Sequence, residues 1–225
     1  MWYSCYAFMH PTGSDKTMMT NCDFASVDGS LCWHTRHVPE DMQVPATGQP
    51  VVHRNFLYLL GGTRGIRDEG DPPMKTVVRY DYDRNKWSRM ADMLDGRLYH
   101  GVTVDGDTIV ACGGKVGHHP TDYLSTCERY ETRLNRWSRM ASMPKRWKGY
   151  LFTIGNTLVA VGGVDVYADI FVHQSGRWRT ADARLPEKLT TSHTTNRYYW
   201  WSPPPVLVPR SFADGNVPPT FQPPS

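Results

Sequence analysis

Short apolar runs recur along the chain, and polar turn residues separate them. Three of these runs end in a pair of glycines: FLYLLGG at Gly61 and Gly62, TIVACGG at Gly113 and Gly114, and TLVAVGG at Gly162 and Gly163. The glycine pairs begin 52 and then 49 residues apart. Apolar runs of this length between turn signals are typical of β-strands. A period near 50 residues predicts a repeat architecture.

A second landmark follows each glycine pair at a fixed distance from a tryptophan. The aromatic residue lies seven positions before the tryptophan in each unit: Tyr80 before Trp87, Tyr130 before Trp137, and Phe171 before Trp178. The first two tryptophans also open the related segments WSRMADM and WSRMASM. Large aromatic side chains bury much apolar area, so we expect them to pack between stacked sheets.

Each unit predicts four antiparallel strands. In the second unit the first strand is expected at about Tyr99 to Val104, with a tight turn at Asp105-Gly106 because Asp and Gly tolerate positive φ. The next strand ends at the glycine pair, which permits close approach of two backbones. A strand with the tyrosine, a polar turn such as DRNK or TRLN and a strand with the tryptophan follow. The predicted fold class is therefore all-β, built from four-stranded blades.

Glycine pair, Tyr-Asp and Trp at this period resemble the kelch-repeat family, most closely the propellers of BTB-kelch (kelch-like) proteins. The pattern M-x-x-x-R before the next strand occurs as Met93 to Arg97, whereas Phe171-Val172 replaces Tyr-Asp in the third unit. The resemblance implies a kelch β-propeller, partial or small, with about three good blades and two degenerate ones. WD-repeat propellers fit poorly because the chain has no Trp-Asp dipeptide.

The repeat divides the chain into six predicted segments. They are a degenerate kelch unit at 1–50, kelch repeats at 51–98, 99–148 and 149–188, a partial repeat at 189–202 and a proline-rich disordered tail at 203–225. Kelch propellers of the resembled family have about six blades, more than this chain supplies. We therefore expect a fragment or truncated product, or a small divergent propeller. No BTB-like segment precedes the repeats in this sequence.

Charge and cysteine usage narrow the class of partner. The formal net charge is +3 and no run of like charge occurs, which does not favour nucleic acid as a partner. The five cysteines form no C-x-x-C pair, and the chain begins without a signal-peptide pattern or a membrane-spanning stretch. We predict free thiols, a cytoplasmic location and no membrane association.

No catalytic motif is visible. The chain lacks G-x-S-x-G, H-E-x-x-H and a phosphate-binding loop, so we predict that it is not an enzyme and needs no cofactor. His118 and His119 form the best metal candidate, but adjacent imidazoles in a loop need further ligands, and a solvated loop is the alternative. Cys112 and Cys127 are expected to be small buried side chains. The cross-linked Cys-Tyr motif of propeller copper oxidases has no counterpart here.

Function is therefore expected in the loops. Those after the glycine pairs span 63–75, 115–125 and 164–167, and those that lead into a first strand span 94–99 and 144–148. The resemblance implies that both sets share one face that holds a bound peptide. Arginine beside exposed aromatics is typical of interfaces, and arginine binds carboxylates well. The candidate residues for an acidic peptide segment are Arg64, Arg67, Arg97, Tyr99, His118, His119, Arg146, Trp147 and Lys148.

The leading functional hypothesis is a protein–protein interaction module that resembles the substrate-recognition propeller of cullin ubiquitin-ligase adaptors. A link to a cullin ligase requires a BTB domain in a longer form. A cytoskeletal, actin-binding kelch protein is one alternative, and a truncated product without independent function is another. An enzyme on a propeller scaffold is a further alternative, because fold alone does not fix function.

Overall fold

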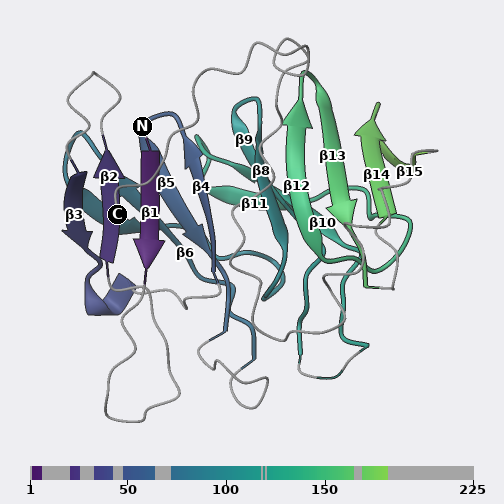
Figure 1. Cartoon of the computed structure of the whole chain (residues 1–225), viewed down its shortest axis with the longest axis horizontal. Helices are drawn as coiled ribbons and strands as arrows, with labels where there is room; N and C mark the ends of the chain where they lie inside the picture. Colours follow the sequence, from purple (N-terminus) through teal and green to yellow (C-terminus); the bar gives the residue numbers. More distant parts are fainter. Residues whose placement is uncertain are drawn as a thin grey trace, which may run out of the picture. The chain divides into compact units, whose positions relative to one another are not determined.

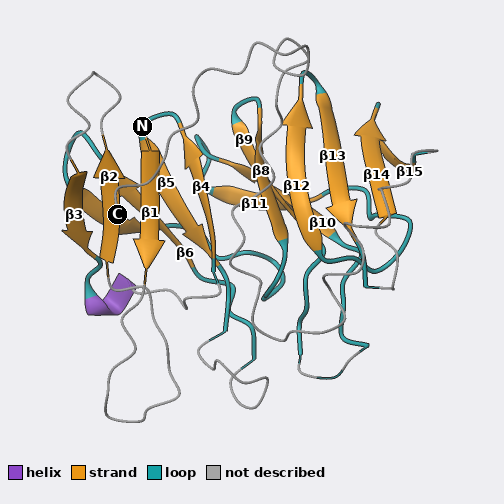
Figure 2. Cartoon of the chain, viewed as in Figure 1, coloured by secondary structure: helices purple, strands orange, loops and turns teal. Residues whose placement is uncertain are grey.

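Antiparallel β-strands account for nearly all the regular structure in the described part of this computed structural model (Figure 1; Figure 2). The structure describes residues 2–6, 21–25, 33–42, 48–63, 72–117, 119, 121–164 and 169–181. Within these ranges, no helix is long and apolar enough to cross a membrane. The all-β prediction is confirmed, whereas the predicted partial repeat at 189–202 and tail at 203–225 lie outside the described residues.

The first sheet has three antiparallel strands in the order β1-β2-β3. They are β1 (Trp2–Tyr6), β2 (Asn21–Ala25) and β3 (Trp33–His37), and the short 3-10 helix η1 (Glu40–Met42) follows them. This sheet lies in the region predicted as a degenerate unit. The buried side chain of Cys22 belongs to a core cluster that also contains residues of the second sheet.

The next three sheets are four-stranded, and in each the strands pair in chain order as an antiparallel meander. This is the blade that the repeat predicts. The strands are β4 (Gln49–His53), β5 (Phe56–Leu60), β6 (Val77–Asp81) and β7 (Lys86–Arg89); β8 (Gly101–Asp105), β9 (Thr108–Cys112), β10 (Cys127–Glu131) and β11 (Arg136–Arg139); and β12 (Gly149–Ile154), β13 (Thr157–Gly162), β14 (Asp169–Gln174) and β15 (Arg177–Thr180).

The turn between the first two strands of the third sheet lies one residue later than predicted. Asp105 pairs with Thr108 at the end of the ladder, so the turn residues are Gly106 and Asp107. Gly106 adopts a φ of 58°, which a residue without Cβ takes at no steric cost.

An aromatic residue faces the tryptophan in each four-stranded sheet. Tyr80 pairs with Trp87 and Tyr130 with Trp137, and each pair of ring centroids is 5.0 Å apart. In the last sheet, His173 faces Trp178 at the same 5.0 Å. The interpretation of Phe171 as the third member of this series is therefore wrong.

The error at Phe171 has a local cause, because the turn between β14 and β15 is shorter by two residues than its two counterparts. The shorter turn changes the spacing of seven positions between the tryptophan and the aromatic residue that faces it. Instead Phe171 lies opposite Thr180, just as Glu128 lies opposite Arg139 in the preceding sheet. Phe171 is thus the structural counterpart of Glu128.

Successive four-stranded sheets share apolar cores. Tyr58 and Leu60 of β5 belong to one cluster with Ile109 and Ala111 of β9. Val110 and Cys112, which point to the other face of β9, form a cluster with Leu158 and Ala160 of β13. Because side chains alternate across a strand, each blade uses one face of its second strand to cover the blade before it.

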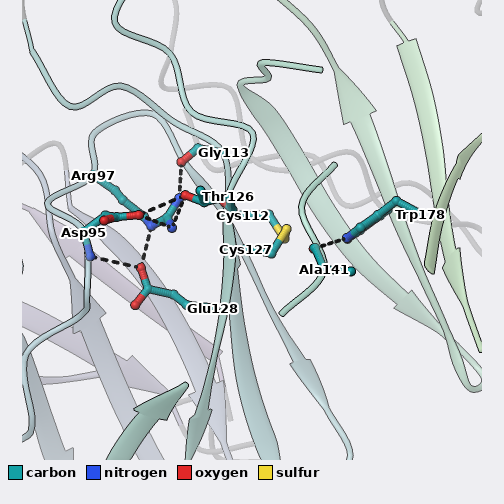
Figure 3. Close-up of a disulfide and its surroundings, with 9 residues drawn as sticks. All are labelled: Asp95, Arg97, Cys112, Gly113, Thr126, Cys127, Glu128, Ala141 and Trp178. Atoms are coloured by element: carbon teal, nitrogen blue, oxygen red, sulfur yellow. Dashed lines mark hydrogen bonds and ion pairs between the residues drawn. A yellow bond between two sulfur atoms is a disulfide. The ribbon is translucent and has the colours of Figure 1, made fainter. Parts of the chain in front are cut away.

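Hydrogen bonds join the blades beside these cores. The indole Nε1 of Trp137 donates to the carbonyl of Ala91, and that of Trp178 donates to the carbonyl of Ala141 (Figure 3). Each acceptor lies in the segment that follows the last strand of the preceding sheet. The repeated tryptophan therefore fills the core and ties its own blade to the previous one.

The glycine pairs lie where the backbones of two blades approach most closely. Gly113 and Gly114 have φ values of 62° and 84°. The amide of Gly114 donates to the carbonyl of Trp147 at 2.8 Å. A Cβ on Gly113 would collide with that same carbonyl oxygen and with the Trp147 ring. Glycine is thus required at Gly113 both for its conformation and for lack of space.

We expect Gly113→Ala to destabilise the chain by about 3 kcal/mol or more, because a positive φ and a backbone clash act together. Gly106→Ala is the matched control. Gly106 also has a positive φ, but a Cβ there meets nothing within 4 Å, so we expect a cost of only about 1 kcal/mol. Urea unfolding of both variants measures the difference. Equal losses would show that close blade contact does not constrain Gly113.

Candidate functional site

The two predicted loop sets meet at one end of the blades. The amide of Gly62 donates to Arg97 O at 2.8 Å, and that of Gly163 donates to Lys148 O at 2.9 Å. Leu98 and Lys115 exchange backbone hydrogen bonds of 3.0 and 2.7 Å. The loops that follow the glycine pairs are thus tied to segments that lead into a first strand, that of the next blade at Gly62 and that of the same blade at Lys115 and Gly163. We call the surface that these segments form the loop face.

Arg97 does not lie on the surface of the loop face. Its side chain is fully buried, so the prediction that it contacts a partner is wrong. The guanidinium donates through Nε to Glu128 at 2.7 Å, through Nη1 to the carbonyls of Gly113 and Thr126, and through Nη2 to Asp95 and the Thr126 hydroxyl (Figure 3). All five of its N–H donors are used. Arg97 is a structural residue that joins strands and loop.

Glu128 completes this buried ion pair. Its side chain is also fully buried, and it accepts hydrogen bonds from the amides of Leu94 and Asp95 at 2.6 and 3.4 Å. Burial lowers the pKa of Arg97, and the neighbouring Glu128 carboxylate opposes that shift. A buried charge pair is tolerated when the remaining hydrogen-bonding capacity is filled, as it is here.

Asp95 extends the pair to the surface. Arg139 binds both of its carboxylate oxygens, at 2.5 and 2.7 Å, and this bidentate contact lowers the pKa of Asp95 to about 2. The Thr126 hydroxyl donates to the same carboxylate at 2.9 Å. The network therefore contains two arginines and two carboxyl groups, those of Asp95 and Glu128.

The next blade replaces the charged pair with apolar groups. Leu94 and Arg97 lie seven and ten residues after Trp87, and Pro144 and Trp147 lie at the same distances after Trp137. Trp147 is fully buried in the cluster that also contains Phe171, the counterpart of Glu128. Pro144 has no N–H, and the amide of Leu94, its counterpart, is one that Glu128 binds. Three positions thus differ together, and the prediction that Trp147 contacts a partner is wrong.

The other candidates fall into three groups. Arg146 and His119 are exposed, and Tyr99 and Lys148 are half-buried. His119 is held within its own loop, since its Nδ1 lies 2.8 Å from the Thr121 hydroxyl and its amide donates to Asp122. Arg64, Arg67 and His118 lie outside the described residues.

Lys115 and Tyr123, which the sequence did not single out, make contacts within the loop face. The ammonium of Lys115 lies 5.9 Å from the centroid of the Tyr123 ring, and that of Lys148 lies 5.4 Å from it. Lys115 is buried, with 5% of its surface exposed, whereas Tyr123 is half-buried. The only signal in the sequence is the position of Lys115 directly after a glycine pair. We call Lys115, Tyr123, Arg146 and Lys148 the cationic loop cluster.

The cysteines differ from the prediction of free thiols. Cys112 and Cys127 lie opposite each other in β9 and β10, and they form a disulfide (Figure 3). Cys22 is also disulfide-bonded, and it lies opposite Cys5 in the register of β1 and β2. The prediction fails because the register that opposes Cys112 and Cys127 depends on the loop length between their strands. It was correct that both side chains are buried.

Metal binding finds no support within the described ranges, where no three His, Cys, Asp or Glu side chains gather in a way that could hold an ion. His118 is not described, so the predicted absence of a metal site stays a prediction.

Comparison with known proteins finds the same repeat. The family model described as the kelch motif matches residues 50–94 and 96–144. The chain is 32% identical over 180 residues to the "Kelch repeat and BTB domain-containing protein F47D12.7" of Caenorhabditis elegans. This match covers 67% of this chain and 29% of that protein. It is 36% identical over 64 residues to "Kelch-like protein 38" of Rattus norvegicus, 28% of this chain and 10% of that protein. The chain therefore spans less than a third of each of these relatives.

A solved structure shares the fold. The chain matches the "Structure of YjhT" with a TM-score of 0.62 at 12% identity, over 81% of this chain and 65% of that chain. At this identity the likeness concerns the fold alone. Together with the four-stranded sheets, it confirms the predicted partial propeller.

We expect Glu128→Gln to destabilise the chain by about 3 kcal/mol, because it leaves the buried Arg97 with only the Asp95 carboxylate, which Arg97 shares with Arg139. The triple variant Leu94→Pro, Arg97→Trp and Glu128→Phe copies the set found in the next blade. It removes both charges together, so we expect it to recover most of that loss. Thermal and urea unfolding measure the stability of both variants. A triple variant no more stable than Glu128→Gln would contradict the equivalence of the two sets.

Removal of the Cys112–Cys127 disulfide by a double change to alanine is expected to cost about 3 kcal/mol, given a loop of 15 residues. Urea unfolding and mass spectrometry of the alkylated protein measure the effect. Dithiothreitol also reduces the disulfide of Cys22, so the control is the same comparison in dithiothreitol, where the unmodified chain and the alanine variant should unfold alike. An unmodified chain that is fully alkylated without reductant would restore the prediction of free thiols.

Proposed function

Because the chain carries kelch motifs on a kelch-repeat fold, we propose that it is a protein-interaction module whose loop face binds an acidic segment of a partner protein. The cationic loop cluster is the observation that supports this proposal. Its members come from two neighbouring blades, since Lys115 and Tyr123 belong to the loop between β9 and β10, and Arg146 and Lys148 precede β12. An extended peptide across both segments would meet the Tyr123 ring on one and the cations of Arg146 and Lys148 on the other.

The geometry of the cluster favours an anion. The ammonium groups of Lys115 and Lys148 both lie within 6 Å of the centroid of one aromatic ring, so positive charge gathers there. A carboxylate that reaches Lys148 accepts charge-assisted hydrogen bonds. Tyr123 adds apolar area that stays rigid, because an aromatic ring has few rotatable bonds. Arg146 is exposed in the segment before β12 and supplies the planar donor that suits a second carboxylate.

The finer role is that of a substrate-recognition propeller. The Caenorhabditis elegans relative is named as a protein that contains a BTB domain besides its kelch repeats, and this chain covers only a part of that protein. We propose that the loop face selects the protein that an adaptor of this kind delivers to a cullin ubiquitin ligase. The cullin link holds only where a BTB domain belongs to a longer form.

The proposed location is cytoplasmic, and catalysis is no part of the proposal. The location rests on the adaptor role, because the Cys112–Cys127 disulfide removes the support that free thiols gave it. The prediction that the chain is not an enzyme stays a prediction.

We expect the double variant Arg146→Met and Lys148→Met to weaken binding of Asp- and Glu-containing peptides roughly tenfold or more, since each lost charge-assisted hydrogen bond contributes about 1.5–3 kcal/mol. Peptide arrays that pair each acidic sequence with its Asn/Gln version identify the probe, and isothermal titration measures its affinity. Binding should also weaken as salt rises.

The matched control is Lys86→Met with Arg133→Met, which removes two exposed cations at the opposite end of the strands. It should leave peptide affinity unchanged. Equal binding by both double variants would place the acidic-peptide site elsewhere. Co-sedimentation with actin filaments that both variants retain would favour the cytoskeletal alternative.

A further inference from the structure

The Cys112–Cys127 disulfide lies directly beside the buried network of Arg97. Gly113 follows Cys112 in the chain, and Thr126 precedes Cys127. The carbonyls of Gly113 and Thr126 both accept hydrogen bonds from Nη1 of Arg97, at 2.6 and 3.0 Å (Figure 3). A shift of either cysteine therefore moves an atom that binds the buried arginine.

The same disulfide closes the base of the loop that joins β9 and β10. It links the last residue of β9 to the first residue of β10, and the amide of Gly113 donates to Thr126 O at 3.0 Å just beyond it. Lys115 follows Cys112 by three positions, and Tyr123 precedes Cys127 by four. Two of the four members of the cationic loop cluster thus lie within one short, cross-linked loop.

The two sulfur atoms occupy a packed core. Cys112 and Cys127 have no exposed area, and they share a cluster with Trp147, Leu158 and Ala160 of the next blade. Bonded sulfur atoms lie much closer together than non-bonded atoms can, and a packed core has little spare volume. Two thiols at this place therefore press β9 and β10 apart. The cysteines form the last pair of the ladder, where strands open most easily.

The proposed cytoplasmic location makes a permanent disulfide unexpected. Glutathione and thioredoxin keep cytoplasmic thiols reduced, and the disulfides that form there are usually transient and redox-sensing. A cross-link that clips a binding loop in such a compartment is placed where a change of oxidation state alters binding.

We propose that the Cys112–Cys127 pair is a reversible redox switch of the loop face. The disulfide form holds the loop between β9 and β10 in the arrangement that binds an acidic segment. The dithiol form spreads the base of the loop, displaces Gly113 and Thr126 from Arg97, and weakens binding. This inference rests on the proposed function, because it concerns the regulation of the same site.

The reaction is thiol–disulfide exchange with a small thiol such as glutathione. A glutathione thiolate attacks one sulfur of the protein disulfide, forms a mixed disulfide and expels the other cysteine as a thiolate. A second glutathione thiolate then attacks the glutathione sulfur of the mixed disulfide, which releases oxidised glutathione and the second cysteine thiolate. Two electrons pass to the protein, and each cysteine thiolate takes up one proton. Oxidised glutathione reverses both steps.

Isothermal titration in buffers of defined glutathione ratio tests the proposal. The probe is an acidic peptide that peptide arrays select on the oxidised chain. Reduction should lower its affinity by about 5- to 150-fold, the usual size of coupling between two elements of one protein. Oxidised glutathione should restore the affinity. Mass spectrometry of the alkylated chain should show that the midpoint of the affinity change coincides with reduction of Cys112 and Cys127, and not with that of Cys22.

The matched variant is Cys112→Val with Cys127→Ile. It copies Val161 and Ile170, which lie opposite each other at the same place in the next blade without a cross-link. The affinity of this variant should not depend on the glutathione ratio. Because its Cys22 is unchanged, it also controls for reduction of the other disulfide.

Four outcomes would overturn the switch. The first is equal affinity of the oxidised and reduced chains, which leaves the proposed function intact. The second is a redox response that persists in the matched variant. The third is a loss of binding that coincides with global unfolding in circular dichroism, because the response is then not confined to the loop. The fourth is an oxidised chain that binds no acidic peptide, which contradicts the proposed function as well.

Discussion

Each blade hides the apolar face of the blade before it, and the rest of the structure depends on this constraint. Ile109 and Ala111 cover the first four-stranded sheet, and Leu158 and Ala160 cover the second. Close approach of the sheets requires glycine where backbones meet, as at Gly113. The loops at that end are then drawn together by hydrogen bonds between blades. The position of the cationic loop cluster is thus a consequence of how the cores pack.

Local and periodic features could be predicted from the sequence. The glycine pairs and the Tyr80–Trp87 and Tyr130–Trp137 partnerships follow from spacing within a single unit, so no tertiary information is needed to find them. The third partnership could not be found in this way. The turn between β14 and β15 is shorter by two residues, so His173 rather than Phe171 lies opposite Trp178.

The candidate site was harder to predict, because burial depends on residues distant in sequence. In the sequence, Arg97 has the features of a partner-binding arginine in an exposed loop. The fold buries it against Glu128, which lies 31 positions later in the chain. Cys112 and Cys127 likewise become partners only once the strand register is set. Exposed Arg146 could be proposed from the sequence, since nothing distant covers it. Lys115 and Tyr123 were missed because their pairing is formed by the fold of one loop.

The polar set around Arg97 and its apolar counterpart around Trp147 also constrain how such a chain can evolve. Repeats multiply and shrink by unequal recombination, which joins the front of one unit to the back of another. A crossover between Leu94 and Glu128 would join a polar front to an apolar back, or the reverse, and leave an unmatched charge in a core. A crossover outside that interval inherits a complete set. Whole units can therefore be exchanged, whereas hybrid units are selected against.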